Sequence, residues 1–149
     1  MVTLRKMVRS DVPVLYDMAL RSFLPDYSKY GFYPPLIKEK TKSFLPPLIF
    51  GKVILTDDTI IGGAFVVGIG KKGEIGSIFI DPVQQRKGYG KQAMLMIEKL
   101  HPRVKRWKLD VLAENHHLHE FYESLGYRKI GEMTDKASGL NGFVYEKTL

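Results

Sequence analysis

The chain has 149 residues, and its 23 Lys and Arg residues outnumber its 16 Asp and Glu residues, giving a formal net charge of +7. A chain of this length predicts one domain, residues 1–149, that can bury its own core. The sequence has no cysteine, which excludes disulfides, thiolate metal sites and a cysteine-acyl intermediate. It shows no signal-peptide h-region and no run of roughly 20 apolar residues, so we expect a cytoplasmic protein that does not enter a membrane.

The N-terminal third predicts a strand followed by two helices. Apolar and polar residues alternate over 2–8, as in a half-buried strand. Ser10 is the expected N-cap of the first helix, whose apolar stripe is formed by Val12, Leu15, Met18 and Ala19. The aromatic-rich segment 23–35 is predicted to be a loop. A short helix is expected at 36–45, because Pro46 and Pro47 would end it.

The remainder predicts a hairpin that turns at Asp57 and Asp58, followed by further strands and helices. The elements expected after the hairpin are a strand at 73–80, a helix at 88–100, a strand at 104–112, a helix between an N-cap at Asn115 and a C-terminal glycine at Gly126, and closing strands at 127–133 and 142–148. The order β-α-α-β-β-β-α-β-α-β-β predicts a mixed α/β fold with about seven strands and about four helices. It argues against a doubly wound nucleotide-binding fold.

Residues 84–91, QQRKGYGK, place two glycines and three cations where a strand gives way to a helix. Unpaired N–H groups and the helix dipole at such a point favour phosphate. A P-loop is excluded, because Gln85 replaces its first glycine and Gln92 replaces the magnesium-binding Ser or Thr. A dinucleotide fingerprint tolerates Ala93 at its third position, but Asp110 matches the required acidic residue only roughly and the strand order is wrong.

The pattern Gln85-x-x-Gly88-x-Gly90 resembles the acyl-CoA pyrophosphate loop of the GNAT acyltransferase superfamily. Asp81 and Pro82 before the loop are also similar to that family. A second unit follows at the family's spacing and consists of Asn115, Tyr122, Leu125, Gly126 and Tyr127. The resemblance covers roughly the C-terminal two-thirds of the chain. It implies a single-domain GNAT-type fold and an acetyl-CoA-dependent N-acetyltransferase, in which an acceptor amine attacks the thioester directly in a ternary complex.

The resemblance also implies roles for individual residues. Tyr122 would protonate the departing CoA thiolate, and Glu74 is the best candidate for the base by position, with water as the alternative. An N–H near Ile78 would polarise the thioester carbonyl. The residues expected to bind acetyl-CoA are Ile78, Phe79, Ile80, Gln85, Arg86, Lys87, Gly88, Tyr89, Gly90, Lys91, Asn115 and Tyr122.

Each of these residues also has a purely structural interpretation. The cations can be a solvated helix start, Glu74 an exposed strand-end carboxylate, and Asn115 a plain N-cap. Tyr122 can be an amphipathic core residue. A catalytically inactive CoA-binding or nucleic-acid-binding regulatory module with the same fold is the alternative function, and the net charge of +7 keeps it open.

Metal and partners are the remaining questions. His116 and His119 stand at helical spacing beside His117, but no further ligand is evident, so no metal is expected. The acceptor should be a primary amine of a small molecule or peptide, contacted by segments 23–35 and 134–142, where Tyr27, Tyr30, Phe32 and Tyr33 suggest a lid. We expect no nucleic-acid partner; a homodimer is compatible with the sequence.

Overall fold

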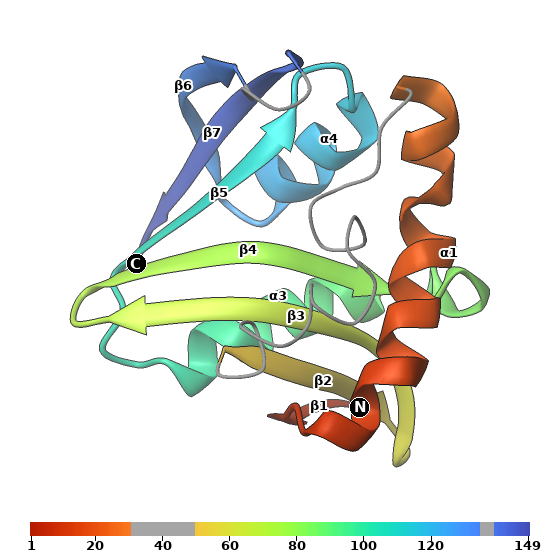
Figure 1. Ribbon diagram of the computed structural model, residues 1–149. Helices are drawn as coiled ribbons and strands as arrows, with labels where there is room; N and C mark the ends of the chain where they lie inside the picture. The colour runs from red at the N-terminus through yellow and green to blue at the C-terminus, as the bar shows by residue number, and fades with distance from the viewer. Residues whose placement is uncertain (31–49, 135–138) are drawn as a thin grey trace. The chain divides into compact units, whose positions relative to one another are not determined.

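The computed structural model describes residues 1–30, 50–134 and 139–149. Its seven strands form a mixed sheet in the order β1-β2-β3-β4-β5-β7-β6, in which β4 and β5 run parallel (Figure 1). The strands are β1 (Val2–Lys6), β2 (Gly51–Thr56), β3 (Thr59–Ile69), β4 (Lys72–Ile80), β5 (Arg106–Leu112), β6 (Arg128–Thr134) and β7 (Asn141–Thr148). The helices in these ranges are α1 (Val12–Tyr30), α3 (Tyr89–Leu100) and α4 (His116–Ser124). The predicted mixed fold is confirmed, and the helix expected at 36–45 lies outside the described residues.

The chain forms two compact units, one from residues 1–66 and 77–100, the other from 67–76 and 101–149. Strands β3 and β4 contribute residues to both. Among the described residues, no helix is long and apolar enough to cross a bilayer.

The core of the first unit lies between α1 and the strands of that unit. The predicted stripe of α1 is confirmed, because all four of its side chains are buried. They share one cluster with strand residues; its buried members are Met7, Val12, Leu15, Met18, Ala19, Val53, Phe65 and Phe79. On α3, Ala93, Met94 and Ile97 are buried at helical spacing.

Two predictions at α1 are wrong. Ser10 is not the N-cap, because residues Arg9–Asp11 form a short 3₁₀ turn, η1, before the helix. The carboxylate of Asp11, the third residue of η1, reaches back to accept the Val8 N–H at 2.8 Å and pairs with Arg5, so its side chain holds the start of this turn. The helix also continues through 23–30, which was predicted to be loop, so Pro25 does not end it. A proline removes one backbone hydrogen bond and kinks a helix, but it need not stop it.

The hairpin prediction is confirmed, and its turn has a clear backbone cause. Asp57 and Asp58 have φ angles of 49° and 62°, so both stand in the left-handed region. Positive φ at both central residues defines the two-residue hairpin turn whose twist matches the flanking strands. The turn closes the pair Thr56 and Thr59 and so sets the register of β2 and β3.

In the second unit, β7 pairs antiparallel with both β5 and β6. Helix α4 ends in a Schellman motif, in which the Tyr127 N–H donates to the Tyr122 carbonyl at 3.1 Å and the Gly126 N–H to Glu123 at 3.0 Å. Gly126 has a φ of 96°, so its predicted role as the C-terminal glycine is confirmed. The motif fixes the direction in which the chain leaves α4 for β6.

Candidate active site

In the first unit, the loop from β4 to α3, residues 81–88, is anchored to α1 at its first residue. Arg21 donates from both terminal guanidinium nitrogens to the Asp81 carboxylate, at 2.6 and 3.3 Å. The same carboxylate accepts the Val83 N–H at 3.3 Å, which caps the 3₁₀ turn η4 (Pro82–Gln84). The hydrogen bond from Arg21 is the largest cause that lowers the pKa of Asp81, and Asp81 therefore remains charged at neutral pH.

Side-chain amides brace the same loop from within. Gln85 Nε2 donates to the Ile80 carbonyl at 2.8 Å, which ties the loop back to the end of β4. Lys87 Nζ donates to Gln84 Oε1 at 3.1 Å. The side chain of Gln85, predicted to bind a cofactor, is thus engaged with the loop itself and holds its shape.

The loop then presents a run of unused backbone donors. Arg86 and Gly88 have φ angles of 65° and 79°, and the Gln92 N–H makes the first helical bond, to Gly88, at 3.2 Å. The N–H groups from Arg86 through Lys91, here called the N–H run, donate to no group in the part of the chain that the structure describes. Successive N–H groups with left-handed residues among them form an anion-binding concavity, and the start of α3 adds the positive end of its dipole.

The end of β4 can offer its main chain and little else. The ring of Phe79 is 3% exposed and packs in the core of the first unit, so this predicted cofactor residue cannot use its side chain. A Cβ on Gly62 would clash with the Phe79 carbonyl oxygen, so β3 needs glycine to come this close to β4. Ile78 is half-buried, and the Ile80 carbonyl is already bound to Gln85.

In the second unit, α4 holds Tyr122 in a fixed and mostly apolar position. Its side chain is 7% exposed and packs edge-on against the rings of Phe121 and Tyr127, with centroids 5.1 and 5.9 Å away. Burial raises the pKa of Tyr122 to about 12. Within the described ranges its hydroxyl has no hydrogen-bond partner. The phenol is therefore neutral at physiological pH and able to donate to a ligand.

Asn115 stands at the N-cap position of α4, but its side chain does not cap the helix. Its carbonyl accepts the Leu118 and His119 N–H groups at 3.1 and 3.3 Å, so the backbone alone starts the helix. The predicted N-cap position of Asn115 is therefore confirmed, but its side-chain amide makes no capping bond and no other hydrogen bond with the residues that the structure describes.

His119 is a satisfied core residue. Its Nε2 lies 3.0 Å from the Ala113 carbonyl, which can only accept, so Nε2 carries the proton. Its Nδ1 lies 2.8 Å from the Tyr145 hydroxyl. No group of three His, Asp or Glu side chains suited to a metal occurs in 1–30, 50–134 and 139–149.

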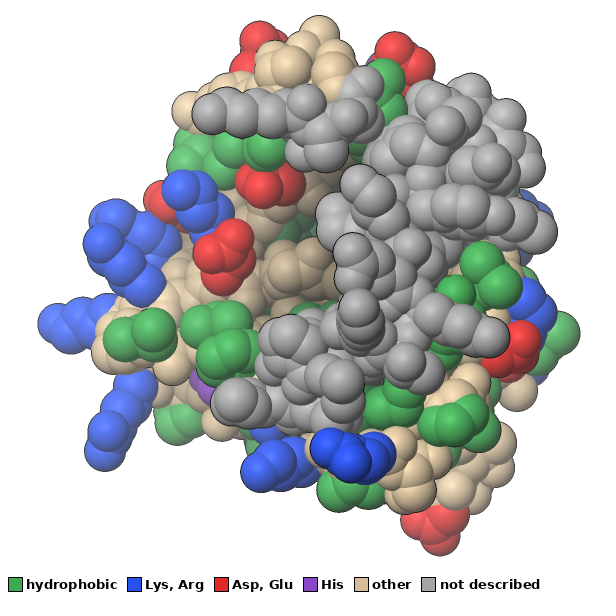
Figure 2. All heavy atoms as spheres, viewed as in Figure 1, with side chains coloured by type: hydrophobic (Ala, Val, Ile, Leu, Met, Phe, Trp, Pro, Cys, Tyr) green, Lys and Arg blue, Asp and Glu red, His purple; other side chains and the backbone are tan. Residues whose placement is uncertain are grey.

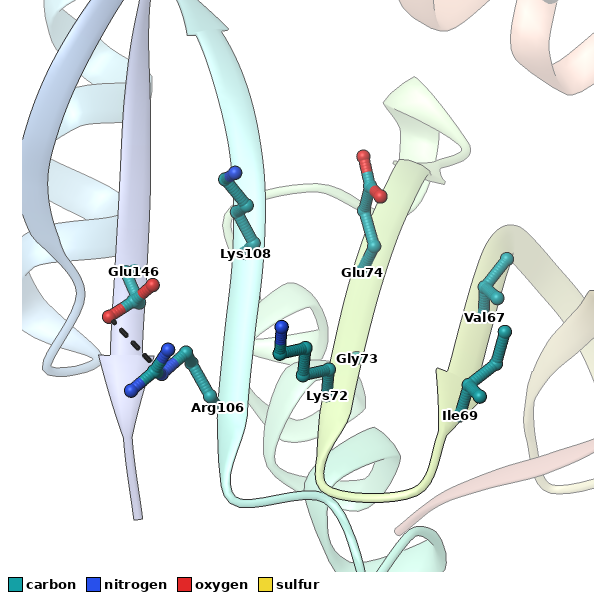
Figure 3. Close-up of a pocket in the computed structure, with 8 residues that line it drawn as sticks. All are labelled: Val67, Ile69, Lys72, Gly73, Glu74, Arg106, Lys108 and Glu146. Atoms are coloured by element: carbon teal, nitrogen blue, oxygen red, sulfur yellow. Dashed lines mark ion pairs between the residues drawn. The ribbon is translucent and has the colours of Figure 1, made fainter.

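An open pocket of about 480 Å³ lies on one face of four strands of the second unit (Figure 3). It is lined by Val67 and Ile69 from β3, Lys72, Gly73 and Glu74 from β4, Arg106 and Lys108 from β5, and Glu146 from β7. The parallel ladder of β4 and β5 places Lys72 beside Arg106 and Glu74 beside Lys108, and it ends there although β5 continues to Leu112. Glu74, the predicted base, thus stands in a charged pocket where the parallel pairing ends.

A comparison with known families decides the classification. The Acetyltransferase (GNAT) family matches residues 12–127, well over half of the chain. The chain belongs to the GNAT acetyltransferase family. No curated protein matches the sequence significantly.

Solved structures of GNAT proteins share the fold at low identity. The PaiA N-acetyltransferase of Thermoplasma acidophilum, in complex with coenzyme A, has a TM-score of 0.79 at 22% identity and covers 100% of this chain and 99% of its own. The ribosomal-protein-S18-alanine N-acetyltransferase of Escherichia coli has a TM-score of 0.76 at 19% identity, covering 99% and 94%. N-acetylglutamate synthase of Neisseria gonorrhoeae, complexed with coenzyme A and N-acetyl-glutamate, has a TM-score of 0.75 at 17% identity, covering 100% of this chain and 35% of its own.

The GNAT motifs did not predict the charged neighbours of Glu74. Lys72, Arg106, Lys108 and Glu146 line the pocket with it. Strand alternation carried a usable signal, since Arg106 and Lys108 flank the buried Trp107 and must share the opposite face. The pairing of β4 with β5, which brings Lys108 beside Glu74, is not visible in the sequence.

Proposed function

We propose that the chain is an acetyl-CoA-dependent N-acetyltransferase that acetylates a primary amine of an acceptor by direct attack in a ternary complex. The observation that carries the proposal is the N–H run, whose donors from Arg86 through Lys91 have no partner in the described protein. A run of unpaired N–H groups at a helix start is the donor set that a pyrophosphate requires.

The proposed cofactor site uses the main chain more than side chains. The N–H run would bind the pyrophosphate of acetyl-CoA, and the exposed side chains of Arg86, Lys87 and Lys91 would add positive charge. The main chain of Ile78 to Ile80 would bind the pantetheine arm, with an N–H near Ile78 as donor to the thioester oxygen. Asn115, whose amide makes no bond within the described protein, would donate to the same arm.

The proposed acceptor site is the pocket that contains Glu74. Bound acetyl-CoA supplies the acetyl thioester. The acceptor ammonium first loses one proton, and the neutral amine then attacks the thioester, so that a C–N bond forms and the C–S bond breaks. The amine's second proton balances the one that the CoA thiolate takes up, so one net proton is released for each ammonium acetylated. An amine is mostly protonated at neutral pH, so a base must remove that proton. Glu74 is the candidate base, acting directly or through a water molecule, and its exposure keeps it in contact with solvent.

Tyr122 is proposed to stabilise the leaving sulfur by a hydrogen bond. Complete proton transfer from a phenol with a pKa of about 12 to a thiolate whose thiol has a pKa near 8.5 is uphill by roughly 5 kcal/mol. A hydrogen bond to developing negative charge has no such cost. We therefore assign Tyr122 the donation of that bond, and the final proton can come from solvent.

Two measurements test this function. Calorimetry should detect acetyl-CoA binding, and a thiol-detecting reagent should report CoA release that depends on an added amine. We expect both, and mass spectrometry should show the acetylated amine. Absence of acetyl-CoA binding would exclude the proposed function, whereas binding without amine-dependent release would favour the inactive CoA-binding module.

A further inference from the structure

The charges in the pocket carry an inference about the acceptor. Three cations and two carboxylates line it, and Arg106 Nε lies 3.7 Å from Glu146 Oε1, so these two form an ion pair. In the part of the chain that the structure describes, neither Lys108 nor Glu74 makes an ion pair or a side-chain hydrogen bond. The pocket therefore presents one carboxylate, that of Glu74, and two ammonium groups, those of Lys72 and Lys108, that the described protein does not neutralise.

We propose that the acceptor is a small amino acid, whose ammonium is bound by Glu74 and whose carboxylate is bound by Lys108. This inference rests on the proposed N-acetyltransferase function and identifies the acceptor class for the same site. It goes beyond a generic amine because it requires an anionic group on the acceptor, close to the nitrogen that is acetylated.

The spacing of the two side chains matches such an acceptor. Glu74 and Lys108 are register partners on adjacent parallel strands, and neighbouring strands lie about 4.8 Å apart. Figure 3 shows both side chains on the same face of the sheet. In an α-amino acid the ammonium and the carboxylate are both attached to the Cα atom. The molecule can therefore lie across the two strands, with its ammonium toward Glu74 and its carboxylate toward Lys108. Charge-assisted hydrogen bonds of this kind are stronger than neutral ones.

The other pocket residues refine the choice. Lys72 lies on the same strand face as Glu74 and is also without an ion pair in the described protein, so the pocket is positive overall. Exposed Lys71 and Arg103 add to this in the second unit. In Figure 2, Lys and Arg side chains project at the edge where the C-terminus lies in Figure 1. Such a field attracts anionic acceptors and opposes polyamines.

An apolar border completes the pocket. Val67 and Ile69 of β3 line it beside β4, and Ile69 is 76% exposed. An exposed isoleucine next to a charged site offers contact to an aliphatic side chain of the acceptor. L-Leucine is therefore the test acceptor, L-leucinamide is its match without the carboxylate, and spermidine represents polycations.

The experiment compares kcat/KM for the three acceptors in the parent protein and in Lys108→Gln, Lys108→Glu and the control Lys105→Gln. Lys105 is exposed and does not line the pocket. We expect the parent and Lys105→Gln to prefer leucine, so that kcat/KM for leucine exceeds kcat/KM for leucinamide. Lys108→Gln should reduce the ratio of these two values by at least about tenfold, equivalent to about 1.4 kcal/mol. Comparing this leucine-to-leucinamide ratio between variant and parent cancels the different intrinsic reactivity of the two amines. Lys108→Glu should shift the preference toward spermidine, which general damage to the site would not do.

A binding measurement keeps the inference separate from catalysis. Backbone N–H signals of Glu74 and Lys108 should shift when leucine is added, and shift less with leucinamide or in Lys108→Gln. Transfer that prefers leucinamide or spermidine in the parent protein would overturn the inference but leave the acetyltransferase function intact. Leucine that binds at these residues without any thiol release would support the ligand class and count against the function. If leucine neither binds nor reacts, the inference is wrong.

Discussion

Arg21 of α1 and Asp81 at the start of the β4–α3 loop form a two-bond ion pair, with Nη1 2.6 Å from Oδ1 and Nη2 3.3 Å from Oδ2. The pair connects a helix near the N-terminus to the segment that presents the N–H run. Arg21 also donates to Asp17 at 3.0 Å, one turn earlier on the same helix, which orients its guanidinium. The loop therefore depends on a residue remote in sequence for its starting position.

Asp81→Asn should lower the free energy of unfolding by about 1 kcal/mol at pH 7, because Arg21 is partly exposed and its pairing is screened by water. The pKa of Asp81 is lowered in the folded protein, so its contribution is present above the unfolded pKa near 3.9 and disappears as pH falls through the folded value. Urea unfolding at pH 7 and at pH 2–3 should show a difference between the proteins that shrinks in acid. A difference independent of pH would show that the charge of Asp81 contributes nothing.

Gly88→Ala should weaken acetyl-CoA binding by at least about tenfold, or about 1.4 kcal/mol. A Cβ at Gly88 would meet no atom within 4 Å, so the substitution penalises only its φ of 79° and thereby the shape of the N–H run. Calorimetry with acetyl-CoA measures the effect.

Gly70→Ala is the matched control, because Gly70 has a φ of 61°, also has open space around it, and lies in the β3–β4 turn. It should cost similar stability and leave acetyl-CoA affinity unchanged. If Gly88→Ala and Gly70→Ala bound acetyl-CoA with equal affinity, the β4–α3 loop would not belong to the cofactor site.

Glu74→Gln should reduce kcat/KM about 10²-fold or more near neutral pH, the lower end for a lost general base. The deficit should become smaller toward the pKa of the acceptor amine, where neutral amine is present without help. Rates measured from pH 7 to pH 10 test this, with Glu120→Gln on the exposed face of α4 as control. Parent-like rates at pH 7 would assign the deprotonation to water alone.

Tyr122→Phe should lower kcat by about 10- to 100-fold, the value of one hydrogen bond to a charged group, with acetyl-CoA affinity almost unchanged. Because burial raises the pKa of Tyr122 to about 12, the loss should be the same at pH 7 and pH 10. Single-turnover rates are the suitable measurement, since they report chemistry and not product release. Rates within about threefold of the parent would leave Tyr122 as a core residue only.

The sequence predicted those parts of the fold that depend on local chemistry. Gly126 ends α4, and the Asp57–Asp58 turn forms because the backbone needs residues that tolerate positive φ there. The helical period likewise placed the buried stripe of α1. The continuation of α1 past Pro25 was missed because the aromatic-rich composition of 23–35 was interpreted as a loop, although a proline removes only one backbone hydrogen bond and need not stop a helix.

The candidate site was predictable only in part, for a similar reason. The glycines and cations of the β4–α3 loop stand together in the sequence, so the N–H run could be anticipated from residues 84–91. The neighbours of Glu74 on β5 could not be anticipated, because they depend on which strands pair and in what register. Parallel pairing joins segments that are far apart in the chain. Arg21 was missed likewise, since its contact with Asp81 is tertiary.

The most direct test of the account is to follow the backbone N–H signals of residues 86–91 by ¹⁵N-resolved NMR while CoA is added, with pantetheine as the comparison. Pantetheine has the thiol arm but no pyrophosphate. If the N–H run binds the pyrophosphate, these signals should move downfield with CoA, as new hydrogen bonds form, and hardly change with pantetheine. Signals that stay in place while CoA binds, or that move equally with pantetheine, would contradict the central claim.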